Sequence, residues 1–174
     1  NAFRGCSNLI LDVLNTSGRT IGTFAFQDVT IKDVIISDTF NCAQSHTYPS
    51  LTYANIQNIS FEQGITFIPA FALSRCSTIT SVDIPDTVTS IGADAFYLCS
   101  SLDILVMFDG VKKIGDRAFD GCPIKTAIVP EIACPYISGS DALDTVIVGS
   151  GTEIRGETFR NSKVKSVMIP NTVT

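Results

Sequence analysis

The chain has 174 residues, of which 45% are hydrophobic and 17% are charged, and its formal net charge is −5. This acidic balance argues against nucleic acid as a partner, because the phosphate backbone requires a basic surface. No apolar run reaches the roughly 18 residues that a membrane helix needs, so we expect no direct membrane insertion.

A pair of apolar residues separated by one residue returns along the whole chain, and successive pairs begin 19 to 25 residues apart. A repeat of this length predicts a solenoid. Within each pair the alternation and the β-branched residues are typical of a short strand with both pair members facing inward. In chain order the pairs are Leu11/Val13, Val34/Ile36, Ile59/Phe61, Val82/Ile84, Leu105/Met107, Ala127/Val129, Val146/Val148 and Val167/Ile169.

The segments between the strands repeat as well. Gly92 and Gly115 mark turns, because glycine allows the chain to reverse at low steric cost. The three-residue spacing that follows, as from Phe96 to Cys99 and Leu102, predicts a short helical or 3-10 turn facing inward. One unit has too little apolar surface to fold alone, so neighbouring units must stack.

These elements predict an α/β fold: a right-handed solenoid with a parallel sheet on one face and short helical or 3-10 turns on the other. We expect one domain over residues 1–174, made of about eight repeats and forming a fragment of a longer array.

The clearest unit is Ile91-Gly92-x-x-Ala95-Phe96-x-x-Cys99-x-x-Leu102-x-x-Leu105-x-Met107. It resembles the BspA-like class of leucine-rich repeats, whose consensus is I-G-x-x-A-F-x-x-C-x-x-L-x-x-V-x-I-P-x-x-V. The resemblance implies the leucine-rich repeat fold and an extracellular or cell-surface interaction domain that binds host matrix or cell-surface proteins. It brings no catalytic residues, metal ligands or cofactors. The closest matches to the consensus are residues 68–88, 91–111 and 114–130.

Three positions depart from this class. Leu73 replaces the phenylalanine, Ser162 stands at the cysteine position, and the unit after Pro130 has Glu131 to Tyr136 where the Ala-Phe element should be. We expect irregular packing in the unit that follows Pro130.

The cysteines are the most reactive side chains that the repeat places together. Cys76, Cys99 and Cys122 are each 23 residues apart and should stack in an inward column, to which Cys6 belongs by its motif. We expect buried, reduced thiols, with a disulfide between neighbours as the alternative. The two remaining cysteines, Cys42 and Cys134, lie off the motif and should be unpaired.

Other chemistry-bearing patterns are weak. A zinc site is not expected, since the chain has no C-x-x-C pair and its single histidine, His46, lies in a predicted surface loop. The glycine-rich stretch 149–156 fits no phosphate-loop spacing and predicts a turn. Asn15 and Asn58 each begin a tripeptide that would accept a glycan, which shows only that secretion is permitted.

The outward face of the predicted sheet carries the most informative signal. The residues midway between the last four inward pairs are all apolar, and Phe108 stands where other units have proline. These side chains would form a continuous stripe, as an interaction surface does, although β-branched residues also favour strands regardless of function. The candidate protein-binding residues are Val106, Phe108, Ile128, Ile147 and Met168.

Earlier repeats carry acidic residues instead, so a partner that contacts both ends would need apolar and basic parts. These acids are Asp33, Asp38, Glu62, Asp83 and Asp86. The first functional hypothesis is therefore a non-enzymatic protein-binding or adhesion domain of a cell-surface or secreted protein. The alternatives are a structural spacer rod and an intracellular regulatory array attached to another domain.

Overall fold

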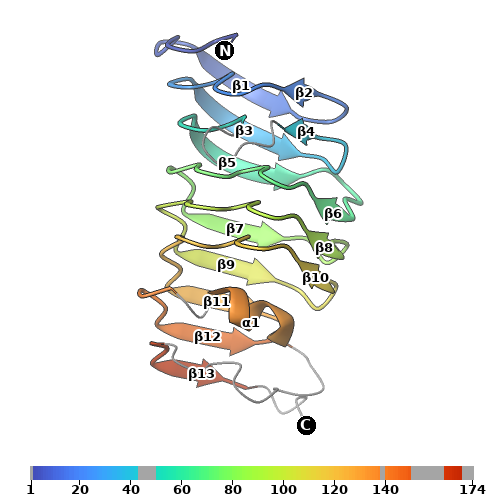
Figure 1. Cartoon of the computed structure of the whole chain (residues 1–174), viewed down its shortest axis with the longest axis vertical. Coiled ribbons are helices and arrows are strands. Elements are labelled where there is room, and N and C mark those ends of the chain that lie inside the picture. The colour runs from blue at the N-terminus through green and yellow to red at the C-terminus, as the bar shows by residue number, and fades with distance from the viewer. Residues whose placement is uncertain (1, 43–49, 138–139, 150–162, 170–174) are drawn as a thin grey trace.

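The computed structural model describes residues 2–42, 50–137, 140–149 and 163–169. The described chain forms a parallel-strand β-solenoid, in which successive coils stack along the long axis from β1 at one end to β13 at the other (Figure 1). Every strand pair in it is parallel, and each pair joins one coil to another coil.

The longer strands form two sheets on one side of the coils. The first sheet has the order β1-β3-β5 and the second has the order β13-β12-β11-β9-β7. Their bounds are β1 Ile10–Asn15, β3 Thr30–Ile36, β5 Asn55–Phe61, β7 Ser81–Ile84, β9 Ile104–Met107, β11 Thr126–Val129, β12 Thr145–Val148 and β13 Ser166–Met168.

Two-residue strands form a second row in the same coils. These are β2 Thr20–Ile21 and β4 Asn41–Cys42 in one sheet, and β6 Phe67–Ile68, β8 Ser90–Ile91 and β10 Lys113–Ile114 in another. The only helical elements of the described chain are adjacent and belong to one coil: a 3-10 turn, Glu131–Ala133, and α1, Cys134–Ile137.

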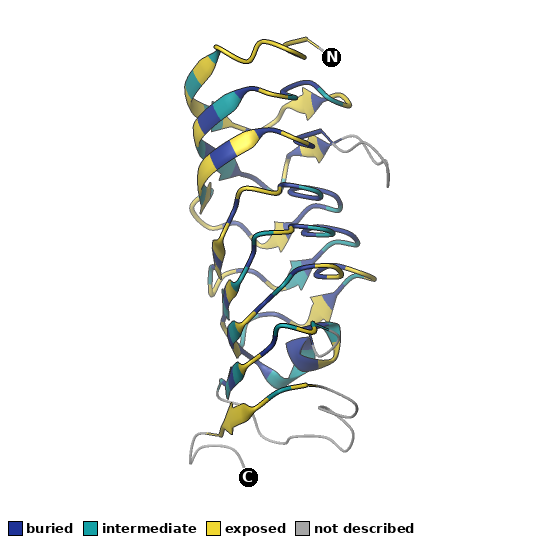
Figure 2. Cartoon of the chain, turned by 90° about the vertical axis from the view of Figure 1, so that its left-hand side faces the viewer, coloured by how far each residue is buried: buried dark blue, intermediate teal, exposed yellow. Residues whose placement is uncertain are grey.

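The register confirms most of the predicted inward pairs. Val82 lies beside Leu105, and Ala127 lies beside Val146. The paired side chains of β3, β7, β9, β11 and β12 are buried, because they face the turns on the other side of each coil. The core therefore extends along the solenoid from Ile21 to Val148 rather than forming one central cluster, and buried segments recur in successive coils (Figure 2).

The predicted pair Leu11/Val13 in β1 was wrong in its second member, whereas Leu11 lies beside the buried Ile31. Val13 is 57% exposed and lies beside Asp33, whereas Leu14 lies beside the buried Val34. In β3 both Ile31 and Val34 are buried although two residues separate them, so the alternation of faces breaks once within this longer strand. A strict two-residue period cannot detect such a break.

Aromatic stacking links neighbouring coils. The rings of Phe96 and Phe119 have centroids 5.1 Å apart and an interplanar angle of 5°, and Phe3 stacks on Phe26 at 5.5 Å. Burying a side chain of this size contributes roughly 1.5–3 kcal/mol. Because the stacking partner always belongs to another coil, no coil can gain this free energy alone.

The prediction of helical turns opposite the sheet, and with it the α/β class, is not confirmed. In the turn after β8, Asp94 and Leu98 have φ of 54° and 55°, and in the turn after β10, Arg117 has φ of 55° and Gly121 has φ of 73°. A helix needs negative φ at every residue, so left-handed residues interrupt these turns. Apart from residues 131–137, the described turns are therefore non-helical.

The coils approach each other closely at two glycines of these turns. A Cβ added at Gly92 would overlap the backbone nitrogen of Ala70, and one added at Gly115 would overlap the backbone nitrogen of Ala93. At Gly22, in the first coil, a Cβ would meet nothing within 4 Å.

We predict that Gly92→Ala lowers the free energy of unfolding by about 1–3 kcal/mol, since two backbones must move apart. The matched variant Gly22→Ala, at the same motif position, should change it by less than about 1 kcal/mol. Urea denaturation followed by circular dichroism measures both. Equal effects of the two variants would contradict the close packing of the coils.

Candidate binding surface on the parallel sheet

The second sheet aligns its outward residues in a single column. The register places Val106 beside Ile128, Ile128 beside Ile147 and Ile147 beside Met168. Neighbouring strands lie about 4.8 Å apart, so successive side chains of the column are in contact range. Four of the predicted binding residues are therefore brought together.

The column reaches solvent along its length. Ile128 is 37% exposed and Met168 is 54% exposed, while Val106 and Ile147 are half-buried. Phe108, the fifth predicted residue, follows β9 and is 50% exposed, at the position where Pro85 and Pro130 follow their strands. Together the five residues give an apolar surface across four strands.

Sequence reasoning missed one member of this surface. Ile104 is 45% exposed and lies two residues before Val106 on the same face of β9. The two-residue period of a strand would have identified it, because Ile104 directly precedes the inward Leu105. We call the set of Ile104, Val106, Phe108, Ile128, Ile147 and Met168 the apolar strip.

Ion pairs border the apolar strip where the strands begin. Lys125 pairs with Asp103 at 3.0 Å, and Lys165 pairs with Asp144 at 3.0 Å. All four side chains are substantially exposed, so each pair contributes at most about 1 kcal/mol to stability. An apolar centre beside a charged rim is the usual composition of a protein–protein interface.

The first sheet presents a mixed outward face instead, in which polar side chains lie beside the exposed Ile10 and Val13 of β1. Lys32 donates a hydrogen bond to Asp12 at 2.6 Å, and this contact lowers the pKa of Asp12 and raises the pKa of Lys32. The Asn58 amide donates to the Asp33 carboxylate at 3.1 Å. The remaining predicted acids nearest the apolar strip, Asp83 and Asp86, are exposed at β7 and just after it.

The predicted cysteine column is buried and reduced at Cys76, Cys99 and Cys122, whereas its fourth expected member, Cys6, is exposed. The thiols of Cys99 and Cys122 donate to the carbonyl oxygens of Leu73 and Phe96, at 3.1 and 3.0 Å, so each links its coil to the preceding one. All six cysteines are free. Five of them are buried and only Cys6 is exposed.

Burial also controls the ionisation of these thiols. It raises the pKa of Cys42 to about 11 and that of Cys134 to about 12, and it also raises the pKa values of Cys76 and Cys99. The thiolate is the reactive form. Each shift therefore makes these side chains poor nucleophiles and poor metal ligands near neutral pH.

The other sequence candidates do not assemble into a site. Asn15 is exposed and accepts a hydrogen bond from the Ser17 amide, far from the apolar strip. His46 and most of the stretch 149–156 lie outside the described residues. In the described ranges, no cluster of three potential metal ligands occurs, and no helix has the length and hydropathy to cross a membrane.

Coils of this length, with parallel strands on one side and recurrent turns on the other, define a leucine-rich repeat solenoid. A model of the BspA type leucine rich repeat region matches residues 1–66 and 50–140, in six copies. The chain therefore belongs to the BspA-type leucine-rich repeat family.

Solved structures with similarity to the chain include three bacterial repeat proteins. A leucine-rich repeat protein from Eubacterium ventriosum is 19% identical with a TM-score of 0.49, and one from Bacteroides ovatus is 18% identical with a TM-score of 0.45. A leucine rich cell surface protein from Faecalibacterium prausnitzii is 25% identical with a TM-score of 0.38.

These alignments cover 94%, 84% and 89% of this chain, in the same order, but only 56%, 45% and 39% of the solved chains. The chain thus spans about half the length of the solved proteins or less. A search of curated proteins finds no match.

We predict that iodoacetamide at about pH 8 modifies Cys6 in the folded chain and leaves the five buried cysteines intact, because burial keeps the reagent away from them. In urea all six should react. Mass spectrometry of the chain gives the number of alkylated cysteines. Rapid modification of Cys99 without denaturant would contradict the packed column.

Proposed function

We propose that this chain is a non-enzymatic protein-binding domain of a cell-surface or secreted repeat protein, and that it holds its partner on the apolar strip. The observation that supports this proposal is the unbroken alignment of Val106, Ile128, Ile147 and Met168 on one exposed face. Contiguous exposed apolar surface of this kind commonly marks an interaction site.

The proposed affinity comes from a few apolar anchors rather than from the charged rim. Fully burying a side chain such as Phe or Ile contributes roughly 1.5–3 kcal/mol, whereas an exposed ion pair contributes at most about 1 kcal/mol. Phe108 and Met168 are half exposed and have the most surface to lose. They and Ile128 are the expected anchors.

The charges beside the apolar strip indicate the complementary partner. Asp83 stands in the same outward column, next to Val106, and Asp86 follows shortly after β7. A partner with an apolar centre and basic residues on the β7 side would pair with both features. An extracellular matrix or host cell-surface protein with such a surface is the proposed ligand.

The reduced cysteines do not decide the compartment. Free thiols are typical of intracellular proteins, which would favour a regulatory array attached to another domain. However, these thiols are buried and bonded to carbonyl oxygens, as at Cys99 and Cys122, so an oxidising medium would not readily reach them. The proposal of a surface or secreted location is compatible with them.

We predict that Ile128→Asp combined with Ile147→Asp weakens binding to a purified extracellular matrix ligand at least about tenfold, because two charges would have to be desolvated at the interface. The side chains point away from the core, so the fold should persist. Surface plasmon resonance over a panel of purified matrix proteins measures the affinity, and circular dichroism checks the fold.

Ile35→Asp is the matched control, since Ile35 is an outward residue of β3, in the first sheet, and lies beside the polar Ser60. It should leave the affinity unchanged. Undiminished binding of the double variant would remove the assignment of the surface. A panel with no binder at all would favour a structural spacer, for which no substitution on this face matters.

A further inference from the structure

Backbone hydrogen bonds join the turns of successive coils into a ladder opposite the long strands. The N–H groups of every second residue in one turn donate to carbonyl oxygens of the next turn. From the turn after β8 the three bonds are Asp94 to Asp116 at 3.0 Å, Phe96 to Ala118 at 2.8 Å and Leu98 to Asp120 at 2.8 Å.

This ladder ends within the solenoid although the sheet continues. The next coil has the helical stretch Glu131–Ile137 where a turn should lie, while β11 and β12 still pair over four residues. Phe119 and Gly121 are the equivalents of Phe96 and Leu98. Among the described residues, the N–H groups of Phe119 and Gly121 have no hydrogen-bond acceptor.

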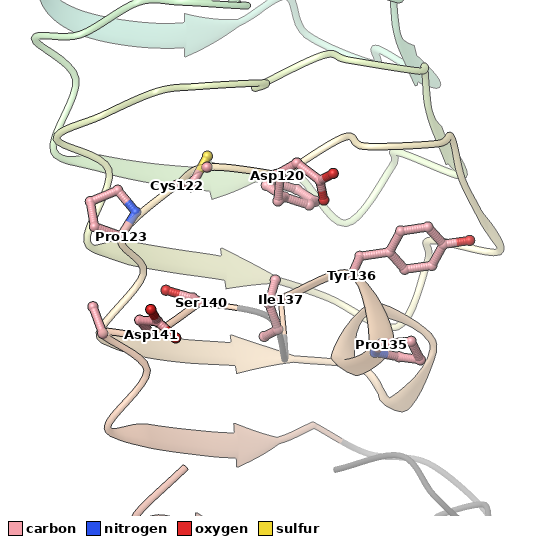
Figure 3. Close-up of a pocket in the computed structure, with 11 residues that line it drawn as sticks. Asp120, Cys122, Pro123, Pro135, Tyr136, Ile137, Ser140 and Asp141 are labelled. Carbon is pink, nitrogen blue, oxygen red and sulfur yellow. The ribbon is translucent and has the colours of Figure 1, made fainter. Parts of the chain in front are cut away.

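A cavity of about 590 Å³ lies at this break, within the size range of ligand sites. Phe119, Cys122 and Ile137 are buried residues of its wall, while Pro135 and Tyr136 come from α1 (Figure 3). The cavity arises because a helix with its side chains is about 10 Å wide, about twice the spacing of the strands opposite. A helix cannot follow the coil above it as closely as a thin turn does.

We propose that this cavity binds a short backbone segment of another protein. Carbonyl oxygens of that segment accept hydrogen bonds from the N–H groups of Phe119 and Gly121, in the role that the next turn has elsewhere in the ladder. Unsatisfied donors in a partly buried site favour a ligand that pairs with them. Addition of a partner's main chain to an unpaired edge is an established mode of peptide recognition.

The geometry favours a peptide over a small anion. One residue separates the two donors along the chain. In the ladder, one residue likewise separates the acceptors Ala118 and Asp120, so a peptide backbone has the matching spacing of carbonyl groups. The two oxygens of one carboxylate are too close together to reach both. The exposed carboxylates of Asp120 and Asp141 also line the cavity, and they would repel an anion and attract a basic side chain.

This site is independent of the proposed function. Its lining residues belong to turns and to α1, and none of them belongs to the apolar strip. A variant that fills the cavity should therefore leave binding at the sheet unchanged, and the double variant of Ile128 and Ile147 should leave binding at the cavity unchanged.

The test is an NMR titration of the ¹⁵N-labelled 174-residue chain with the blocked peptide acetyl-Gly-Ala-Lys-Ala-Phe-Lys-Gly-amide. This probe copies the length of the turn 115–121, with alanine in place of Asp116 and lysine in place of Arg117 and Asp120. We expect saturable shifts of the Phe119 and Gly121 amide signals, with the Phe96 amide unaffected because its bond to Ala118 is already made. Sodium acetate and sodium phosphate serve as anion probes.

Two variants locate the site. Ala142 lines the cavity, so Ala142→Trp should fill it and weaken the peptide at least about tenfold. Pro123, which also lines the cavity, directly follows Cys122, and Ser77 holds the equivalent position after Cys76. The turn before Ser77 makes its hydrogen bonds to the next turn, so Ser77→Trp should have no effect. The proposal is overturned if the peptide leaves both amides unmoved at millimolar concentration, if acetate or phosphate shifts them as strongly, or if Ala142→Trp binds the peptide as the unchanged chain does.

Discussion

Contact between successive coils is the interaction on which the rest of this molecule depends. Each coil is a single thin layer, so its apolar side chains face one another across the coil but remain uncovered above and below, and they pack on those of the neighbouring coils, as Phe96 does on Phe119. Polar groups obey the same constraint. Arg117 forms an ion pair with the buried Asp94 at 2.9 Å, and the thiol of Cys122 donates to a carbonyl oxygen of the previous coil. Apolar packing, charge pairing and backbone hydrogen bonding are thus all satisfied between coils, and stability should rise with the number of neighbours.

The same stacking generates the candidate surfaces. When strands pair in register, any outward position becomes a column, and an apolar residue repeated there, as at Val106, Ile128 and Ile147, becomes an extended surface without any tertiary rearrangement. An irregular unit has the opposite effect. The helical residues 131–137 keep the sheet side of the coil in register but separate the turn side, and this leaves donors and a cavity at one level. The regular repeat thus produces the apolar strip, whereas the irregular coil produces the cavity.

The repeat made the fold and the outward column predictable, since the spacing of pairs such as Val82/Ile84 and Leu105/Met107 determines which strands lie side by side. The first strand was misread because its alternation breaks near Asp12, where no turn residue or glycine signals the change. The turns could not be predicted, because left-handed backbone occurs at Leu98 and Arg117, which are not residues that favour it. The irregular coil was anticipated from the missing Ala-Phe element, but its cavity depends on the width of a helix that the sequence did not predict.

A double-mutant cycle on Phe96 and Phe119 tests the stacking of coils most directly. The single variants Phe96→Leu and Phe119→Leu and the double variant are compared by urea denaturation. Ring stacking at 5.1 Å predicts a coupling free energy of about 0.5–1.5 kcal/mol, so the double variant should lose less stability than the sum of the two single losses. Additive losses, with a coupling of about zero, would mean that the two rings do not touch, and would contradict the stacked-coil account.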